Sequence, residues 1–354
     1  MSEMPELDLS RWAVVGPKDE TGVGRMGNDL KRALSPIKRL VSPSARFHDQ
    51  KIDTGETNFP HNGSETQWRK ALDGLQGIII LEDHDWVHRL IPFAKKMGLR
   101  VVTVVLWEWF RWYGTGWKSC DLFICPNRFC EKVLKRLGIK KSVVLTWPLD
   151  LDALAPRIIR GPAKRFLHNV GLFEPDDRKA TRIVIDAFVQ TPLKDVEFIV
   201  RVQNKLDRKI PDSRFRIVNG HLEHHADLYA EGDVAVQPSK CEGLGFLLLE
   251  AMASGLPLIT TDYPPMNEYV RRKTLLVSTR WGKFPAEQTP YVPQAHFKIP
   301  KVDSLVKCIK WCATHDMEPI SRENRLWAEE TFNAERVRAA WMNALESVLL
   351  GSAR

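Results

Sequence analysis

Two glutamates, Glu242 and Glu250, lie close together in the stretch Asp233–Glu268 and have the chemistry to bind a substrate rich in hydroxyl groups. An ionised carboxylate only accepts hydrogen bonds, and it can take two hydroxyl donors at once, as a ribose or a hexose offers. Gly243 and Gly245 add a loop without side chains at the expected start of a helix, where backbone N–H groups favour phosphate oxygens. These residue types indicate a site for a sugar joined to phosphate.

The two glutamates are positioned by a predicted strand, loop, helix and second strand. The run Asp233–Gln237 predicts a buried strand, Gly245–Ser254 predicts a helix, and Leu258–Thr260 predicts the next strand. The helix has a stop signal, because Gly255 can take the left-handed cap conformation and Pro257 cannot continue a helix. The first glutamate is therefore expected in the loop before the helix, and the second within the helix.

The string PSKCEGLGFLLLEAMASGLPLI, which contains both glutamates, resembles the signature of retaining glycosyltransferases of family 4, the GT-B type with two Rossmann-like domains. The resemblance implies an α/β fold of two facing doubly wound domains, with the active site in the cleft between them. It implies that Glu242 meets the transferred sugar as a catalytic residue and that Glu250 meets the nucleotide ribose. Backbone amides at the sugar and phosphates would come from Gly243, Leu244, Gly245 and Phe246. The alternative is a buried helix whose second glutamate caps a neighbouring loop.

A pair of cations follows the predicted strand Arg165–Val170, where the loop ends at Arg178 and Lys179 as a helix begins. Two cations beside free helix N–H groups, at the carboxyl end of a strand, would clamp a diphosphate. The resembling family uses such a pair in this loop for that purpose, often followed by glycine where this chain has Ala180. The alternative is a solvated helix start, which is unusual because cations oppose the helix dipole there.

Glycines follow the first predicted strand, Trp12–Val15, and lead into a helix expected to start near Arg25 or Met26. A strand that runs through a glycine-rich turn into a helix is suited to bind an anion. The spacing is not the dinucleotide fingerprint, so we exclude binding of NAD. The resemblance implies that Gly22 and Gly24 face the donor diphosphate; the alternative is a plain turn.

His84 follows the predicted strand Gly77–Leu81, at the end of a parallel strand where such sheets hold ligands. It is a candidate catalytic residue on the acceptor side, because a histidine can orient or deprotonate a hydroxyl. The alternative is a surface loop histidine.

The predicted strand Arg100–Leu106 ends in WEWFRWYGTGW, whose aromatic residues follow one another too closely to be all core on one period. Aromatic faces stack on sugar rings and on bases, so this segment indicates part of an acceptor pocket. Many members of the resembling family have a histidine here, whereas this chain has Trp107, Glu108 and Trp109. Glu108 is therefore a second candidate base, with packing between domains as the alternative.

Length and pattern predict two domains in the 354 residues. The first, residues 1–150, repeats strands and helices, and the run TWPLDLDALAP reads as a linker. The second, residues 151–325, restarts the pattern. The resemblance implies that this second domain binds the nucleotide sugar and that the first is the acceptor-side domain. The resemblance implies that a last helix within residues 326–354 returns to the first domain. The segment Pro285–Pro300 is expected to be an irregular loop.

Composition is that of a globular cytoplasmic protein, with 44% hydrophobic and 27% charged residues and no apolar run that could cross a membrane. The net charge is +8, and residues 1–150 carry 23 Lys+Arg against 18 Asp+Glu. A basic face would attract nucleic acid, a membrane surface or a phosphorylated glycan carrier, and the alternative is a mixed solvated surface.

No metal site is expected, because the spacing of the six cysteines matches no zinc knuckle. Three histidines, His221, His224 and His225, lie on a predicted surface helix and are interpreted as structural. The resemblance requires no cofactor apart from the nucleotide-diphosphate sugar as donor substrate. The oligomeric state stays open.

The predicted function is transfer of a sugar, with retention of configuration, from a nucleotide sugar to a hydroxyl acceptor. A glycan or lipid-linked carrier is the acceptor that the resemblance implies. The basic first half and the aromatic cluster leave open an acceptor that is a hydroxyl-bearing modified base in DNA. A non-catalytic nucleic-acid-binding protein on the same scaffold and a sugar-nucleotide epimerase are further alternatives.

Overall fold

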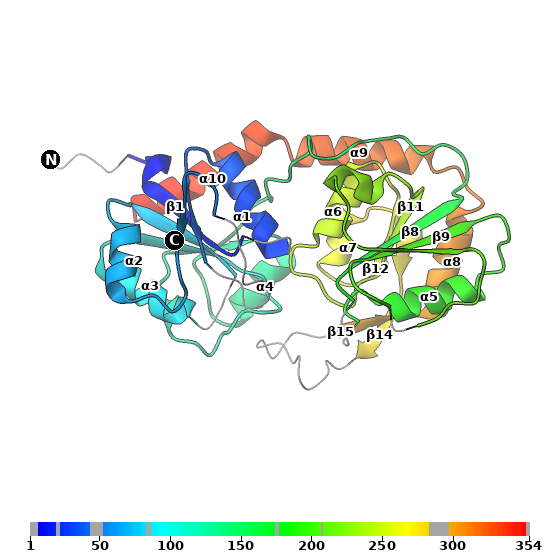
Figure 1. Ribbon diagram of the computed structural model, residues 1–354, viewed down its shortest axis with the longest axis horizontal. Helices are drawn as coiled ribbons and strands as arrows, with labels where there is room; N and C mark the ends of the chain where they lie inside the picture. The colour runs from blue at the N-terminus through cyan, green and yellow to red at the C-terminus, as the bar shows by residue number, and fades with distance from the viewer. Residues whose placement is uncertain are drawn as a thin grey trace. The chain divides into compact units, whose positions relative to one another are not determined.

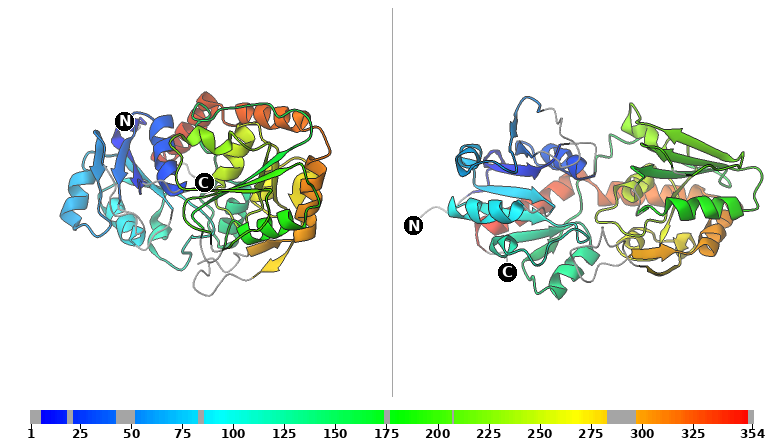
Figure 2. Two further views of the ribbon diagram at one scale, coloured as in Figure 1. Left: turned by 45° about the vertical axis from the view of Figure 1, so that its right-hand side comes forward. Right: turned by 60° about the horizontal axis from the view of Figure 1, so that its bottom comes forward.

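The computed structural model describes residues 6–18, 22–42, 52–82, 86–173, 177–206, 208–282 and 297–351. These residues form two compact units (Figure 1). The first unit holds the described residues up to Leu149 together with those from Phe332 onward, and the second holds those from Asp150 to Thr331. Each unit is a parallel sheet with helices on both faces (Figure 2).

In the described part of the first unit, seven parallel strands form one sheet in the order β3-β2-β1-β4-β5-β6-β7. The central strands are buried along their whole length, as expected where helices cover both faces of a sheet. The strands are β1 (Trp12–Gly16), β2 (Lys38–Val41), β3 (Glu56–Asn58), β4 (Gly77–Leu81), β5 (Arg100–Val104), β6 (Leu122–Cys125) and β7 (Ser142–Val144). The helices are η1 (Leu9–Arg11), α1 (Gly22–Ala33), α2 (Glu65–Leu72), α3 (Val87–Lys96), η2 (Gly116–Ser119), α4 (Arg128–Arg136) and α10 (Ala334–Leu349).

The last helix, α10, packs on the first unit. The indole Nε1 of Trp341 donates a hydrogen bond to the Thr146 carbonyl oxygen at 3.0 Å, and its ring meets Trp147 edge to face. Arg338 donates to the carbonyl oxygens of Ala33 and Ser35, at the end of α1. Residues separated by about 200 to 300 positions in sequence thus share one core.

In the described part of the second unit, six parallel strands form a sheet in the order β10-β9-β8-β11-β12-β13, and two further strands form an antiparallel hairpin. The strands are β8 (Arg165–Gly171), β9 (Glu197–Val202), β10 (Phe215–Asn219), β11 (Val234–Gln237), β12 (Leu258–Thr261), β13 (Leu276–Val277), β14 (Thr279–Gly282) and β15 (Phe297–Pro300). The helices are α5 (Thr181–Gln190), η3 (His225–Tyr229), α6 (Phe246–Ala253), α7 (Met266–Tyr269), η4 (Lys273–Leu275), α8 (Val302–Cys312) and α9 (Glu318–Thr331).

The strand order of the second unit determines where a ligand can bind. The chain moves from β8 to β9 and β10 on one side, and then returns to β11, which pairs with the other edge of β8. Loops that leave the carboxyl ends of such strands diverge and leave a crevice, which is the usual ligand site of an open α/β sheet. The loops after β8 and β11 carry Arg178, Lys179 and Glu242, so the topology brings these three residues to the same edge.

Most predicted strands are confirmed, with ends that shift by one or two residues. Helix α2 begins with a capping box formed by Ser64 and Gln67, and Gly255 has a φ of +82° as predicted for the end of α6. The short strands β2 and β3 and the helices α3 and α9 were not predicted. The two strands are only four and three residues long, α3 contains a proline, and α9 is rich in charged residues.

Three predictions about local structure are wrong. Helix α1 begins at Gly22 and not near Arg25, because N–H groups of a first turn need no partner inside the helix and glycine is tolerated there. Residues His225–Tyr229 form a short 3₁₀ helix and not a surface α-helix, and Tyr229 is buried. In the segment expected to be irregular up to Pro300, residues Phe297–Pro300 form β15, while residues 285–296 lie outside the described ranges.

Among the described residues, no helix is both long enough and apolar enough to span a bilayer.

Candidate functional site

A buried ion pair joins the loops that leave β8 and β11. The Lys179 Nζ lies 2.5 Å from the Glu242 Oε1, and the two side chains are 17% and 5% exposed. The residues are 63 positions apart in the sequence, and the parallel pairing of β8 with β11 brings their loops together. The backbone of Lys240 also donates to the Arg178 carbonyl oxygen at 2.8 Å, which ties the two loops to each other. The two predicted groups therefore form one site.

The opposite charges of Lys179 and Glu242 favour each other's ionised form, which burial alone would disfavour. Burial raises the pKa of Glu242, but the positive charges of Lys179 and Arg178 lower it more, so its pKa lies below the ordinary value. Burial lowers the pKa of Lys179, and the Arg178 charge adds to that effect against the attraction of Glu242. The site thus holds an ionised carboxylate beside two cations.

Lys179 keeps hydrogen-bonding capacity for a ligand. An ammonium group has three donors, and the one protein acceptor that Lys179 Nζ contacts among the described residues is Glu242. The remaining donors can meet phosphate oxygens, which are acceptors only. The ion pair therefore positions the ammonium group and leaves donors available for a ligand.

Two N–H groups in the first turn of α5 already donate to a carboxylate, so these two are not free for a ligand. Asp177 accepts from the backbone N–H groups of Thr181 and Arg182, at 2.6 and 3.2 Å. Lys240 Nζ lies 3.6 Å from the same carboxylate. The prediction that α5 offers its N–H groups to a diphosphate is therefore wrong, because a residue of the loop itself caps the helix.

A buried histidine that sequence reasoning missed supports both loops. His168, on β8, is fully buried, with its Nδ1 2.7 Å from the Val236 carbonyl oxygen and its Nε2 3.0 Å from the Thr181 Oγ1. Burial, with a smaller effect of the Lys179 charge, lowers the pKa of His168 to about 4, although the hydrogen bond to Val236 acts in the other direction. The ring is therefore neutral, donates from Nδ1, accepts at Nε2, and links β8, β11 and the start of α5.

The loop before α6 ends in a conformation that requires glycine. Gly245 is the N-cap of α6 with a φ of +81°, and its carbonyl oxygen accepts from the N–H of Leu248 at 2.9 Å. The Tyr269 hydroxyl donates to the Leu244 carbonyl oxygen at 2.9 Å, which holds the loop from the other side. Gly243 and Leu244 are buried, and Phe246 is half-buried at the first position of the helix. The predicted segment is thus a rigid turn into a helix N-terminus.

Glu250 lies within α6 and is fully buried. Its Oε2 accepts from the Tyr229 hydroxyl at 2.7 Å and lies 3.1 Å from the His225 Nε2. Sequence reasoning interpreted His225 as a surface residue, because the contact joins segments 25 positions apart and follows no local period. The second glutamate is therefore held by two aromatic side chains from η3.

Removing one hydroxyl tests how strongly this carboxylate depends on Tyr229. Tyr229→Phe leaves a buried charged acceptor with one partner fewer, and such a loss costs about 1.5–3 kcal/mol. Tyr269→Phe is the matched control, because its hydroxyl donates to a neutral carbonyl and its loss costs about 0.5–1.5 kcal/mol. Urea unfolding of the two variants measures the difference. Equal losses would show that Tyr229 does not stabilise the charge of Glu250.

The candidate residues of the first unit lie in different elements and differ in burial. Gly22 and Gly24 belong to the first turn of α1, Gly22 exposed and Gly24 buried. Glu108 follows β5 in the sequence and is 3% exposed. Burial raises the pKa of the Cys130 thiol, with smaller contributions from Cys125 and from the charge of Glu108. His84 lies outside the described residues.

The aromatic segment after β5 divides between core and surface. Trp107 and Phe110 are buried, with Trp107 edge to face on Phe129 at 4.9 Å between ring centroids. Trp112 and Tyr113 are 39% and 57% exposed. The segment was expected to line an acceptor pocket, and the exposed pair at its centre is the part that presents rings to solvent.

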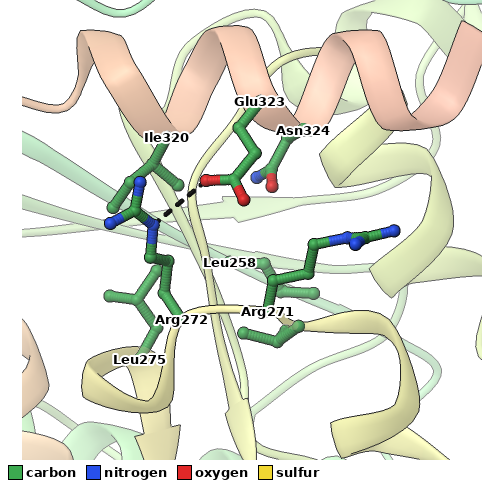
Figure 3. Close-up of a pocket in the computed structure, with 8 residues that line it drawn as sticks. Leu258, Arg271, Arg272, Leu275, Ile320, Glu323 and Asn324 are labelled. Carbon is green, nitrogen blue, oxygen red and sulfur yellow. Dashed lines mark hydrogen bonds and ion pairs between the residues drawn. The ribbon is translucent and has the colours of Figure 1, made fainter.

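A small cavity of the second unit lies away from the site. It is lined by residues from the start of β12, from the segment after α7 and from α9, and Arg272 bonds Glu323 there (Figure 3). Leu258, the first residue of β12, is at the opposite end of the sheet from the loops that carry Glu242. The cavity therefore takes no part in the candidate site.

Within the ranges that the structure covers, no group of three or more His, Cys, Asp or Glu side chains is arranged to hold a metal ion. All six cysteines lie among the described residues, where they are buried and form no disulfide bond.

Comparison of the sequence with known proteins gives matches to glycosyltransferases. Residues 164–284 match the profile of glycosyl transferases group 1. A sulfoquinovosyl transferase of Arabidopsis thaliana is 26% identical over 247 residues, which are 65% of this chain and 46% of that protein. The chain thus spans about half the length of that relative.

Comparison of the structure gives matches along nearly the whole chain. HepE of Anabaena, solved with UDP and glucose, has a TM-score of 0.68 at 13% identity, over 95% of this chain and 100% of that one. Sucrose-phosphate synthase from Thermosynechococcus elongatus has a TM-score of 0.64 at 14% identity, over 96% and 99%. The chain therefore has the fold of GT-B glycosyltransferases, and its second unit resembles the group 1 glycosyl transferases in sequence.

Proposed function

We propose that this chain is a retaining glycosyltransferase of the family 4 type that moves a sugar from a nucleoside-diphosphate sugar to a hydroxyl acceptor, a glycan or a lipid-linked carrier. The observation that carries the proposal is the buried pair of Lys179 and Glu242, with Arg178 beside it, at the topological switch point of the second unit. The match to group 1 glycosyl transferases covers this segment, and the structural relative HepE was solved with UDP and glucose.

In the proposed complex, the donor lies across the loops that leave β8 and β11. Arg178 and Lys179 contact the diphosphate, together with backbone N–H groups from Gly243 to Phe246 at the start of α6. Glu242 accepts from hydroxyls of the transferred sugar, and Glu250 accepts from the ribose. Gly22 and Gly24 are further candidate donor-binding residues, as the family resemblance implies.

The reaction needs positive charge where negative charge develops. The bond between the anomeric carbon and the phosphate oxygen breaks with its electron pair going to the diphosphate, and Arg178 and Lys179 stabilise that charge without reorganisation. The acceptor oxygen then bonds the anomeric carbon on the face that the diphosphate leaves, and its proton passes to a diphosphate oxygen. Glu108 and His84 are the candidates for orienting the acceptor hydroxyl.

Thermal unfolding in the presence of different nucleoside diphosphates and nucleoside-diphosphate sugars tests the proposed donor. A ligand that binds only the folded state raises the melting temperature, so one nucleotide of the panel is expected to stand out. Its nucleoside, which lacks phosphate, should have a much smaller effect. A panel in which no nucleotide shifts the melting temperature would contradict the proposal.

Arg178→Ala then tests the role of the phosphate contacts. Loss of one charge-assisted contact of about 1.5–3 kcal/mol should weaken binding of the selected nucleoside diphosphate about 10- to 100-fold and leave the nucleoside unaffected. Arg182→Ala is the control, because Arg182 is the second residue of α5 and its guanidinium packs over the Phe173 ring at 4.7 Å. Equal effects of both variants would argue against a specific phosphate contact.

A further inference from the structure

The hairpin β14–β15 is attached to the loop that carries Glu242. The backbone N–H of Lys298, on β15, donates to the Lys240 carbonyl oxygen at 3.1 Å, and the N–H of Lys240 donates to the Arg178 carbonyl oxygen at 2.8 Å. The hairpin therefore continues the row of backbone contacts that begins at the loop after β8. Lys298 is thus joined, through the backbone of Lys240, to the loop that carries Glu242.

One face of the hairpin holds a lysine between two aromatic rings. Trp281 and Lys298 are directly opposite each other in the antiparallel register, so their side chains share a face. The Lys298 Nζ lies 3.0 Å from the centroid of the Trp281 ring and 4.8 Å from that of Tyr263. Lys298 is 8% exposed, whereas Trp281 is 67% exposed.

Lys298 differs from the other buried lysine of this region in having no carboxylate partner. Among the described residues, its Nζ makes the two ring contacts and no ion pair or hydrogen bond. Burial lowers the pKa of Lys298. A cation–π contact offsets part of the cost of burying a charge, and a hydrogen-bonded anion offsets more of it.

These features describe a place that suits an anion. An ammonium with three donors that lies between two rings, and that has no carboxylate partner among the described residues, attracts a phosphate or a carboxylate. The exposed Trp281 offers an aromatic face, and such faces stack on sugar rings. One ligand that satisfies both groups is a saccharide that carries a negative charge.

We propose that Tyr263, Trp281 and Lys298, here called the hairpin subsite, bind an anionic saccharide, through its phosphate or carboxylate at Lys298 and its sugar ring at Trp281. The identity of this saccharide as a substrate depends on the proposed function, whereas the binding itself does not. The charged saccharide is either part of the donor or the acceptor, and the two sources are distinguished by competition.

Isothermal titration calorimetry with four probes tests the hairpin subsite. The probes are glucose, glucose 1-phosphate, glucuronic acid and inorganic phosphate. We expect the two charged sugars to bind the unmodified protein at least about tenfold more tightly than glucose, by about 1.4 kcal/mol or more. Inorganic phosphate should bind more weakly than glucose 1-phosphate, because it lacks the ring that contacts Trp281.

Three hairpin variants assign the binding to side chains. Lys298→Gln should abolish the preference for charged sugars, and Lys298→Arg should keep it and controls for folding of the hairpin. Arg280→Gln is the matched control, because Arg280 is exposed and pairs with Ile299 on the other face of the same strand. The proposal is overturned if Lys298→Gln binds charged sugars as the unmodified protein does, or if Arg280→Gln loses them equally.

Competition with the nucleoside diphosphate selected by thermal stabilisation identifies the source. Binding at the hairpin subsite that persists at saturating nucleotide supports an anionic acceptor. Binding that the nucleotide displaces supports an anionic group of the donor. If the protein binds a nucleotide but shows no preference for charged sugars, the hairpin subsite is overturned and the proposed function stands. If it prefers charged sugars but binds no nucleotide, the proposed function is contradicted and the hairpin subsite stands.

Discussion

Replacing Lys179 by methionine is expected to lower the free energy of unfolding by about 3–5 kcal/mol, because it leaves the carboxylate of Glu242 buried without its partner. The methionine fills similar space, so the loss reports charge and not a cavity. Release of nucleoside diphosphate from the selected donor should fall to background at the same time. Urea unfolding of the second unit and an assay of the released nucleotide measure the two effects.

The pH dependence of this variant gives a sharper test. In the unmodified protein the pKa of Glu242 is lowered, so its contribution to stability is present above its ordinary value of 4.5 and is lost as the pH falls through the lowered pKa. In the Lys179→Met protein, the effect of burial on Glu242 dominates and favours its protonated form. The difference in unfolding free energy between the two proteins should therefore narrow as the pH falls from 7 to about 4.

Two further variants act as controls for the ion pair. Lys179→Met combined with Glu242→Gln removes both charges and should recover most of the lost stability, because a neutral pair of similar size needs no compensation. Lys240→Met removes a neighbouring lysine from Asp177, whose carboxylate keeps two backbone donors, and should cost less. A Lys179→Met protein as stable as the Lys240→Met protein would show that the pair is not a stabilising contact.

Gly27→Ala is expected to destabilise the first unit by about 3 kcal/mol, although alanine is the better helix former. Gly27 lies in α1, where a Cβ would overlap the guanidinium of Arg39. Arg39 is fully buried on β2 and donates to the carbonyl oxygens of Val14 and Pro17, at 3.2 and 2.5 Å. Displacing a buried charged donor costs more than the roughly 1 kcal/mol that alanine contributes to a helix.

The next residue of the same helix provides the comparison. Asn28 is exposed, so Asn28→Ala should stabilise α1 slightly or leave it unchanged. The midpoint of thermal unfolding, together with hydrogen-exchange protection in β1 and α1, measures both variants. A Gly27→Ala protein that melts at or above the temperature of the unmodified one would mean that α1 can move away from Arg39 at little cost.

Local patterns were sufficient to predict most strands of both sheets and the turn into α6. Alternation of short apolar runs with polar loops predicts a parallel α/β fold, because strands that helices cover on both faces are apolar along their length. The capping box of α2 and the stop at Gly255 depend on residues within a few positions of each other. The strand β3 has three polar residues and lacks that signal, and it was missed.

The sequence predicted the residues of the site but not their contacts, because local patterns do not relate distant segments of the chain. The motif identified Glu242 and Glu250, and the loop identified Arg178 and Lys179, but no local period relates Lys179 to a residue 63 positions away. The same limit applies to the contacts of Glu250 with Tyr229 and His225. Free N–H groups were expected at the start of α5, and the structure shows Asp177 bonded to them.

The amino-acid sequence by itself determined which residues of this protein could do chemistry and on which strands, turns and helices they lie, because those properties depend on neighbours along the chain. The tertiary structure alone decided which charges meet. The order of strands in the second sheet places β8 beside β11 and thereby pairs Lys179 with Glu242. The register of β14 with β15 likewise places Lys298 against Trp281. Such pairings depend on how distant segments pack together, and the pattern within any one segment does not contain that information.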